Sequence, residues 1–124
     1  MIMVVDDDTN VLRLVELMLN RVRCTVVTLN EPLEAVDLLA SVTPNLFILD
    51  QMMPRMSGFE LCRHIRSCPA TAQTPIIMLS ALYEPNSITE GLRAGANVYL
   101  PKSALHSDLL DHVRVLLDME NARC

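Results

Sequence analysis

Five short apolar runs alternate with patterns of helical period, and this alternation constrains the fold more than any other feature of the sequence. Each run is of strand length and apolar throughout, which is typical of strands that are covered on both faces in a parallel sheet. The runs occupy residues 1–5, 25–29, 46–49, 75–79 and 98–100. Between them, apolar residues recur at intervals of three and four, as in segments 11–22 and 33–40. The pattern predicts five strands, each followed by a helix.

Alternating strands and helices with right-handed crossovers form an open parallel sheet that has helices on both faces. The chain has 124 residues, of which 51% are hydrophobic, enough for one domain with a real core. We therefore expect an α/β, doubly wound fold in a single domain over residues 1–124. Two capping boxes, "SGFE" at 57–60 and "SITE" at 87–90, predict helix starts, and Gly95 predicts a helix end.

Composition excludes several classes of protein. The formal net charge is −5 and no cluster of Lys and Arg is available to neutralise phosphates, so we expect no direct binding of nucleic acid. No apolar run is long enough to cross a bilayer, which favours a cytoplasmic protein without membrane contact. The four cysteines lack the spacing of a zinc site.

Three carboxylates follow two of the predicted strands. Asp6 and Asp7 end the first strand and Asp50 ends the third. Ligands of open parallel sheets bind at the carboxyl ends of the strands, so these acids are expected to meet at one edge. Clustered carboxylates repel one another unless a cation is present, and Mg²⁺ prefers such oxygen ligands. A plainer interpretation also stands for "DDD" at 6–8, namely a helix start that Asp8 or Thr9 caps.

A hydroxyl and an ammonium group are expected at the same edge. Ser80 ends the fourth strand, and Lys102 follows the fifth. A carboxylate nucleophile, a metal, a lysine and a hydroxyl donor together make a site for phosphoryl transfer.

The segments "VVDDD", "ILDQMMPRMSGFEL", "IIMLSA" and "AGANVYLPK" resemble the receiver domain of bacterial two-component response regulators, and the resemblance covers the whole chain. It implies a flavodoxin-like (βα)5 fold with strand order 2-1-3-4-5. It also implies a phosphorylation-dependent switch rather than a conventional enzyme, one that catalyses only its own phosphotransfer and autodephosphorylation. The phosphoryl donor would be the phosphohistidine of a sensor histidine kinase or a phosphotransfer protein, with Mg²⁺ as cofactor.

The resemblance assigns a role to each matching residue. Asp50 would be the phosphoacceptor, Lys102 the phosphate partner, Ser80 the switch hydroxyl and Tyr99 the aromatic switch. The metal ligands would be Asp6, Asp7, Asp50 and the backbone carbonyl of Met52. The output surface would comprise the helix that follows residue 87, the strand at 98–100 and the last helix. An output module after Cys124 or a phosphorylation-dependent homodimer would then read this surface.

Two departures from the family pattern bear on the expected structure. Where the family usually has Lys-Pro, this chain has Lys102-Ser103. A cis bond before a residue other than proline costs about 2.5–4 kcal/mol. We therefore expect a trans bond, with Lys102 farther from Asp50 than the resemblance implies. Asn97 and Val98 replace acids that one subgroup uses in a dimer, so that dimer is not expected.

Other classes of function remain open at this stage. A phosphatase of the haloacid dehalogenase type also forms an aspartyl phosphate, but it needs a second Asp where this chain has Met52. A flavin carrier needs a phosphate loop after the first strand and aromatic residues that stack on a ring, whereas this chain has "DDDTN" there and no Trp. A degenerate receiver that acts only as a docking module is a third alternative.

Overall fold

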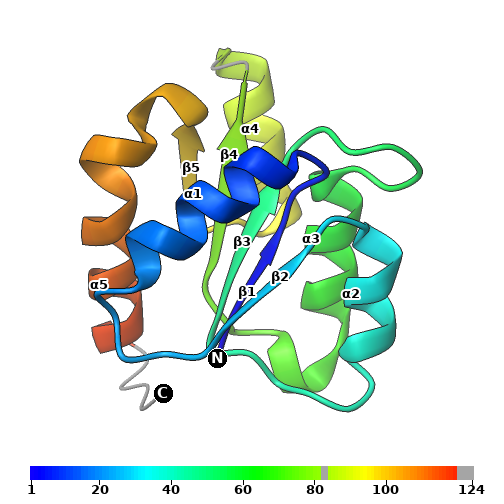
Figure 1. Cartoon of the computed structure of the whole chain (residues 1–124). Coiled ribbons are helices and arrows are strands. Elements are labelled where there is room, and N and C mark those ends of the chain that lie inside the picture. Colours follow the sequence, from blue (N-terminus) through cyan, green and yellow to red (C-terminus); the bar gives the residue numbers. More distant parts are fainter. Residues whose placement is uncertain (82–83, 120–124) are drawn as a thin grey trace.

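A computed structural model describes residues 1–81 and 84–119 and has one five-stranded parallel sheet (Figure 1). The strands are paired in the order β2-β1-β3-β4-β5, as expected from the resemblance. Each strand coincides with one of the predicted apolar runs. The strands are β1 (Ile2–Val5), β2 (Val26–Leu29), β3 (Leu46–Asp50), β4 (Ile76–Ser80) and β5 (Val98–Pro101).

A helix follows each strand, which confirms the doubly wound architecture. The α-helices are α1 (Thr9–Leu19), α2 (Pro32–Leu38), α3 (Gly58–Ser67), α4 (Pro85–Ala94) and α5 (Leu110–Met119). Short 3-10 turns occupy Pro69–Thr71 and Lys102–Ala104, and a π-helical turn at Leu105–Leu109 leads into α5. None of the described helices is long and apolar enough to span a membrane.

The sheet separates two apolar cores, because successive side chains of a strand point to opposite faces. Helices α1 and α5 cover one face, and α2, α3 and α4 cover the other (Figure 1). In β1, for example, Met3 and Val5 belong to the core under α2 to α4, whereas Ile2 and Val4 belong to the core under α1 and α5. Burial on both faces explains why the strands are apolar without alternation.

The apolar stripe of the last helix belongs to the core under α1 and α5. Leu109 and Val113 are fully buried, Leu117 is buried and Leu110 is half-buried. The last helix was expected to form part of the output surface, but its apolar stripe is mostly used in the fold itself.

The structure confirms two of the three helix boundaries that were predicted from local signals. Ser57 and Glu60 form the predicted capping box at the start of α3, and Gly95 ends α4 with a φ of 119°. The capping box predicted at 87–90 is wrong, because α4 begins earlier. Glu84 occupies the cap position and Pro85 the first helical position, where a fixed φ and a missing N–H cost nothing.

Candidate functional site

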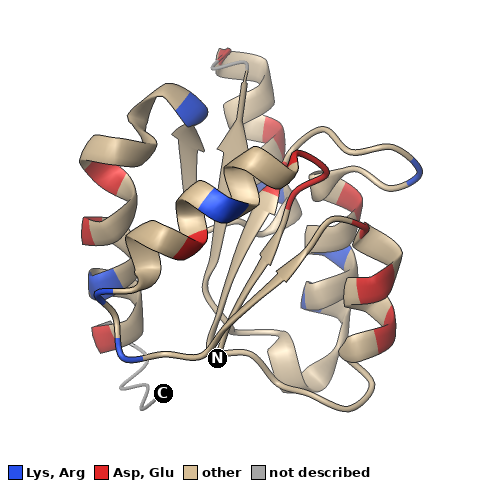
Figure 2. Cartoon of the chain, viewed as in Figure 1, with Lys and Arg blue, Asp and Glu red and all other residues tan. Residues whose placement is uncertain are grey.

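The predicted acids meet at the carboxyl edge of the sheet. Val5 of β1 pairs with Leu49 of β3, so the next residues, Asp6 and Asp50, stand side by side. Both are almost completely buried, whereas Asp7 is exposed. Ligand oxygens of the three acids lie within 4.8 Å of one another. The loop after β1 is correspondingly the acidic segment at this edge in Figure 2.

Lys102 reaches into this cluster from the end of β5. Its Nζ lies 3.1 Å from Oδ2 of Asp6 and 3.2 Å from Oδ1 of Asp50. The described residues include no cis peptide bond, so the bond before Ser103 is trans, as predicted. The accompanying expectation of a more distant lysine is wrong. The 3-10 turn that starts at Lys102 leaves the side chain at the sheet edge, and its long stem spans the remaining gap.

Burial dominates the electrostatics of the cluster. It raises the pKa of Asp50 to about 7, and the charge of Asp6 adds to that rise, whereas Lys102 opposes it. Burial also raises the pKa of Asp6, although the hydrogen bond from the Asp8 amide and the positive charge of Lys102 oppose the rise. Burial alone would lower the pKa of Lys102, but its contacts with both acids outweigh burial and raise that pKa.

The donor set fits a hard divalent cation. Oδ2 of Asp6 is buried beside the Lys102 ammonium. Within the described part of the chain, however, no donor makes a hydrogen bond of suitable geometry to this oxygen. Buried carboxylates need compensation by charge, and Mg²⁺ is bound by one or two carboxylates with carbonyls and waters. Asp6, Asp7 and Asp50 therefore form a pocket that could bind a metal.

The start of α1 supports the plainer interpretation of one acid in the "DDD" run. Oδ1 of Asp8 accepts a hydrogen bond of 2.9 Å from the amide of Asn10 and caps the helix. The amide of Asp8 in turn donates to Oδ1 of Asp6 at 2.9 Å. Asp8 thus acts as a cap, and its backbone helps to orient the buried acid.

Gly58 fixes the segment that follows Asp50. A Cβ at this position would lie 2.1 Å from the backbone oxygen of Asp50, a separation that no side chain allows. The Gly58 amide donates to the carbonyl of Gln51 at 2.8 Å. Only glycine lets α3 begin so close to the end of β3.

An ion pair holds the same loop against α2. Arg55 has a φ of 72°, and its Nη1 lies 2.6 Å from Oε2 of Glu31, the cap residue of α2. Residues other than glycine rarely adopt this backbone region. The positive φ of Arg55 lies in the short segment between Pro54 and Gly58.

Ser80 and Tyr99 both contact Gln51, a residue that was not predicted to belong to the site. The hydroxyl groups of both side chains donate to Oε1 of Gln51, and all three residues are buried. The signal available in the sequence was a polar amide directly after the apolar strand that ends at Asp50. Its partners could not be inferred, since they are 29 and 48 residues away.

Met52 stands two residues after Asp50 and is 64% exposed. Its side chain lines a hollow of about 440 Å³ together with Gln51, Met53, Pro54, Ser57 and Phe59. Among the exposed side chains, the one nearest to Asp50 in sequence is therefore the apolar thioether of Met52.

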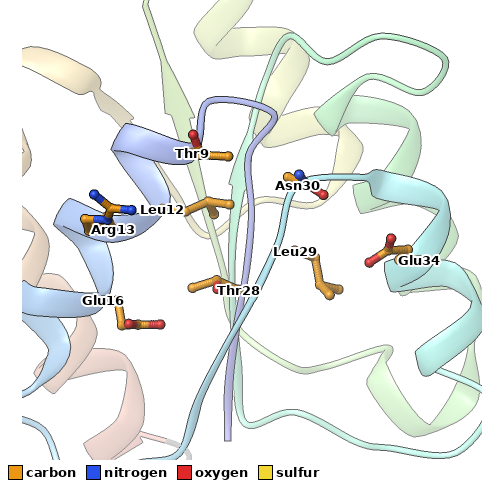
Figure 3. A pocket seen from close by; sticks show the side chains of 8 residues that line it. All are labelled: Thr9, Leu12, Arg13, Glu16, Thr28, Leu29, Asn30 and Glu34. Atoms are coloured by element: carbon orange, nitrogen blue, oxygen red, sulfur yellow. The ribbon is translucent and has the colours of Figure 1, made fainter.

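A separate groove of about 380 Å³ runs between α1 and β2. Figure 3 shows Arg13 and Glu16 on its α1 side and Asn30 and Glu34 on its α2 side. The clustered acids are not among the lining residues that the structure describes. The candidate site is therefore the acidic cluster and not this groove.

The family model of the response regulator receiver domain matches residues 2–114. The chain belongs to the receiver domains of response regulators. This family is neither of the two unrelated classes that the sequence left open, the phosphatases of haloacid dehalogenase type and the flavin carriers. Receiver domains take part in two-component signalling, in which they interact with histidine kinases or phosphotransfer proteins.

Relatives and solved structures agree with this assignment. The response regulator MprA of Mycobacterium avium is 39% identical over 116 residues, which make up 94% of this chain and 50% of MprA. The chain thus spans about half the length of the curated relatives it matches. DrrB of Thermotoga maritima, an OmpR/PhoB homologue, superposes with a TM-score of 0.86 at 32% identity over 96% of this receiver and 52% of DrrB.

Receiver domains solved alone are equally similar. CheY4 of Vibrio cholerae has a TM-score of 0.86 at 28% identity and covers 94% of this chain, with 97% of its own chain aligned. The receiver domain of DrrB, solved in a BeF3-activated form, has a TM-score of 0.86 at 32% identity. Both support the flavodoxin-like fold.

Proposed function

We propose that this receiver accepts a phosphoryl group on Asp50 from the phosphohistidine of a sensor histidine kinase or a phosphotransfer protein. The observation that carries the proposal is the ion pair of one ammonium group, that of Lys102, with two buried carboxylates, Asp6 and Asp50. Such a cluster concentrates negative charge at one edge and supplies a cation for the oxygens of a phosphoryl group.

In the transfer, a carboxylate oxygen of Asp50 attacks phosphorus while the bond from phosphorus to the histidine nitrogen breaks. The electron pair of that bond returns to the imidazole, and Asp50 becomes an acyl phosphate. Lys102 then faces a group that carries more negative charge than the carboxylate did, so its ammonium balances the product. The receiver catalyses only this transfer and its own later dephosphorylation.

Mg²⁺ is the cofactor that this proposal requires. Asp6, Asp7, Asp50 and the backbone carbonyl of Met52 would hold it, and when bound it would neutralise charge on the phosphoryl oxygens. The buried, unsatisfied Oδ2 of Asp6 and the grouping of the three acids support this assignment.

The output would pass through Ser80 and Tyr99 to the surface of α4, β5 and α5. Phosphorylation would draw the Ser80 hydroxyl toward the phosphoryl oxygens and shift the population between two existing arrangements. Since the curated relatives are about twice as long as this chain, an output module after Cys124 is part of the proposal. Cys124 itself lies outside the described residues. A phosphorylation-dependent homodimer is the other proposed route, and no direct contact with nucleic acid is proposed for this domain.

Intact mass spectrometry after incubation with acetyl phosphate and Mg²⁺ tests the proposal. One phosphoryl group is expected on the wild-type chain and none on Asp50→Asn. Asp37→Asn, which changes an exposed acid of α2, is the matched control and should be labelled normally. Labelling of Asp50→Asn, or labelling of the wild type in excess EDTA, would contradict it. An unlabelled wild type would favour the docking module.

A further inference from the structure

Gln51 joins the two residues that the proposed function assigns to the switch. Its side chain is buried, and its Oε1 accepts one hydrogen bond from the Ser80 hydroxyl and one from the Tyr99 hydroxyl. An amide oxygen has two lone pairs, so the two donors occupy both. A single atom therefore connects the end of β3 to the end of β4 and to β5.

The backbone holds this acceptor in a fixed place. The Gln51 amide donates to the carbonyl of Leu79 at 2.8 Å, and the Gln51 carbonyl accepts from the amide of Gly58 at 2.8 Å. Gln51 is thus anchored to β4 on one side and to the start of α3 on the other. A rigid acceptor of this kind orients the hydroxyl groups of Ser80 and Tyr99 that donate to it.

Ser80 and Asp50 project from opposite faces of the sheet, and Ser80 donates to Gln51 on its own face. Asp50 pairs with Leu79 of β4, and Leu79 belongs to the core under α1 and α5. Ser80 is the next residue, so its side chain projects from the opposite face, which also carries Tyr99. The ring of Tyr99 is itself confined there, because a Cβ at Gly91 would lie 2.7 Å from its Cδ2.

We propose that Gln51 is a positioning residue that competes with the phosphoryl group on Asp50 for the hydroxyl proton of Ser80. The inference rests on the proposed function. A serine hydroxyl has one proton to donate, so a bond from Ser80 to a phosphoryl oxygen requires that its bond to Gln51 break. Gln51 therefore weakens the Ser80 contact with the phosphoryl group.

Binding of beryllofluoride, a phosphoryl analogue, at a fixed Mg²⁺ concentration measures this competition by ¹⁹F NMR. Gln51→Met keeps the size of the side chain and removes the acceptor. Because one hydrogen bond is no longer lost on binding, this variant should bind roughly two- to tenfold more tightly than the wild type. Gln73→Met, the same change at an exposed position before β4, is the matched control and should bind like the wild type.

A double-mutant cycle with Ser80→Ala identifies the route of the effect. Since the competition acts through the Ser80 hydroxyl, Gln51→Met should leave the affinity unchanged in the Ser80→Ala background. Circular dichroism checks that each variant is folded. If Gln51→Met does not fold, Gln51→Asn serves in its place, because its shorter amide cannot reach both hydroxyls, and the affinity should rise in the same direction.

Each outcome decides between the two proposals. Unchanged or weaker binding by the Gln51 variant, or an equal gain in the Ser80→Ala background, overturns the role of Gln51 and leaves the phosphorylation of Asp50 intact. A wild type that neither binds beryllofluoride nor is labelled by acetyl phosphate overturns both.

Discussion

Nζ of Lys102 lies 3.2 Å from Oδ1 of Asp50, although β4 separates the strands that carry the two residues. The long lysine stem crosses the end of β4 and brings its charge to the acids of β1 and β3. The contact is partly shielded from solvent, since the Lys102 side chain is 22% exposed and that of Asp50 only 4%. Lys102 is thus the cation that allows two carboxylates to be buried side by side.

Lys102→Met should destabilise the fold at pH 8 by about 1–3 kcal/mol in EDTA, because it leaves the buried acids without their cation. At pH 5 the loss should be smaller, since Asp50, with a pKa of about 7, is then protonated. Urea unfolding at the two pH values measures the difference. Arg63→Met is the control, because its ion pair with Glu90 is long at 3.9 Å and both side chains are more than half exposed. Equal losses at both pH values would argue against this role of Lys102.

Asp50→Asn should stabilise the protein at pH 8 in EDTA by an amount on the order of 4 kcal/mol. The pKa of Asp50 is about 7 in the folded protein, above the ordinary value that the unfolded chain retains. The folded state then binds more protons than the unfolded state, so stability falls as pH rises from about 4 to about 7 and is constant above it.

The pH profile of unfolding checks this directly. At pH 4 the variant and the wild type should differ little, and their curves should separate up to about pH 7. Asp37→Asn on the exposed surface of α2 removes the same charge and should give a profile parallel to that of the wild type. A wild type whose stability increases between pH 5 and pH 7 in EDTA would contradict the raised pKa.

The fold was predictable because its strands are covered on both faces. Double coverage makes a strand continuously apolar, and a four-residue run such as 46–49 is then visible in the sequence itself. The edge at which Asp6, Asp50 and Lys102 meet follows from the same reasoning, since parallel strands share their carboxyl ends. Topology thus predicted both the architecture and the grouping of the acids.

The positions of long side chains, and the outcome where two helix-start signals compete, were not predictable in the same way. The distance from Lys102 to Asp50 depends on how a flexible stem lies across β4, which no local pattern encodes. The shared oxygen of Gln51 depends on two donors distant in sequence. At the start of α4, two signals competed, and Pro85 at the first position prevailed over the Ser and Glu of the "SITE" segment.

Arg55→Gly should be more stable than Arg55→Ala by about 1 kcal/mol. Both variants lose the ion pair with Glu31, but only glycine adopts a φ of 72° without strain. Arg63, an exposed residue inside α3, gives the matched pair, and there Ala should exceed Gly by about 1 kcal/mol because the backbone is helical. Urea midpoints of the four variants give the comparison, and the same order at both positions would refute the backbone argument.

Met52→Asn should shorten the lifetime of the phosphorylated receiver. Met52 lies two residues beyond Asp50 and is open to solvent, and its thioether cannot orient a water molecule as an amide can. Because one hydrogen bond to the attacking water is gained, dephosphorylation should be roughly two- to tenfold faster. The backbone carbonyl, and with it the proposed metal ligand, is retained. The decay of the phosphorylated mass after removal of acetyl phosphate gives the rate.

Leu33→Asn makes a similar change from an apolar side chain to an amide at an exposed position of α2, and its decay should match that of the wild type. The comparison separates the effect of an amide near Asp50 from that of added surface polarity. Measurements with saturating Mg²⁺ keep the metal equally bound in all variants, so that a difference in rate reports on water and not on the cation. If the phosphorylated form of Met52→Asn decays at the wild-type rate or more slowly, the thioether does not limit the access of water. The rate of dephosphorylation is then set by the cluster formed by Asp50, Asp6 and Lys102.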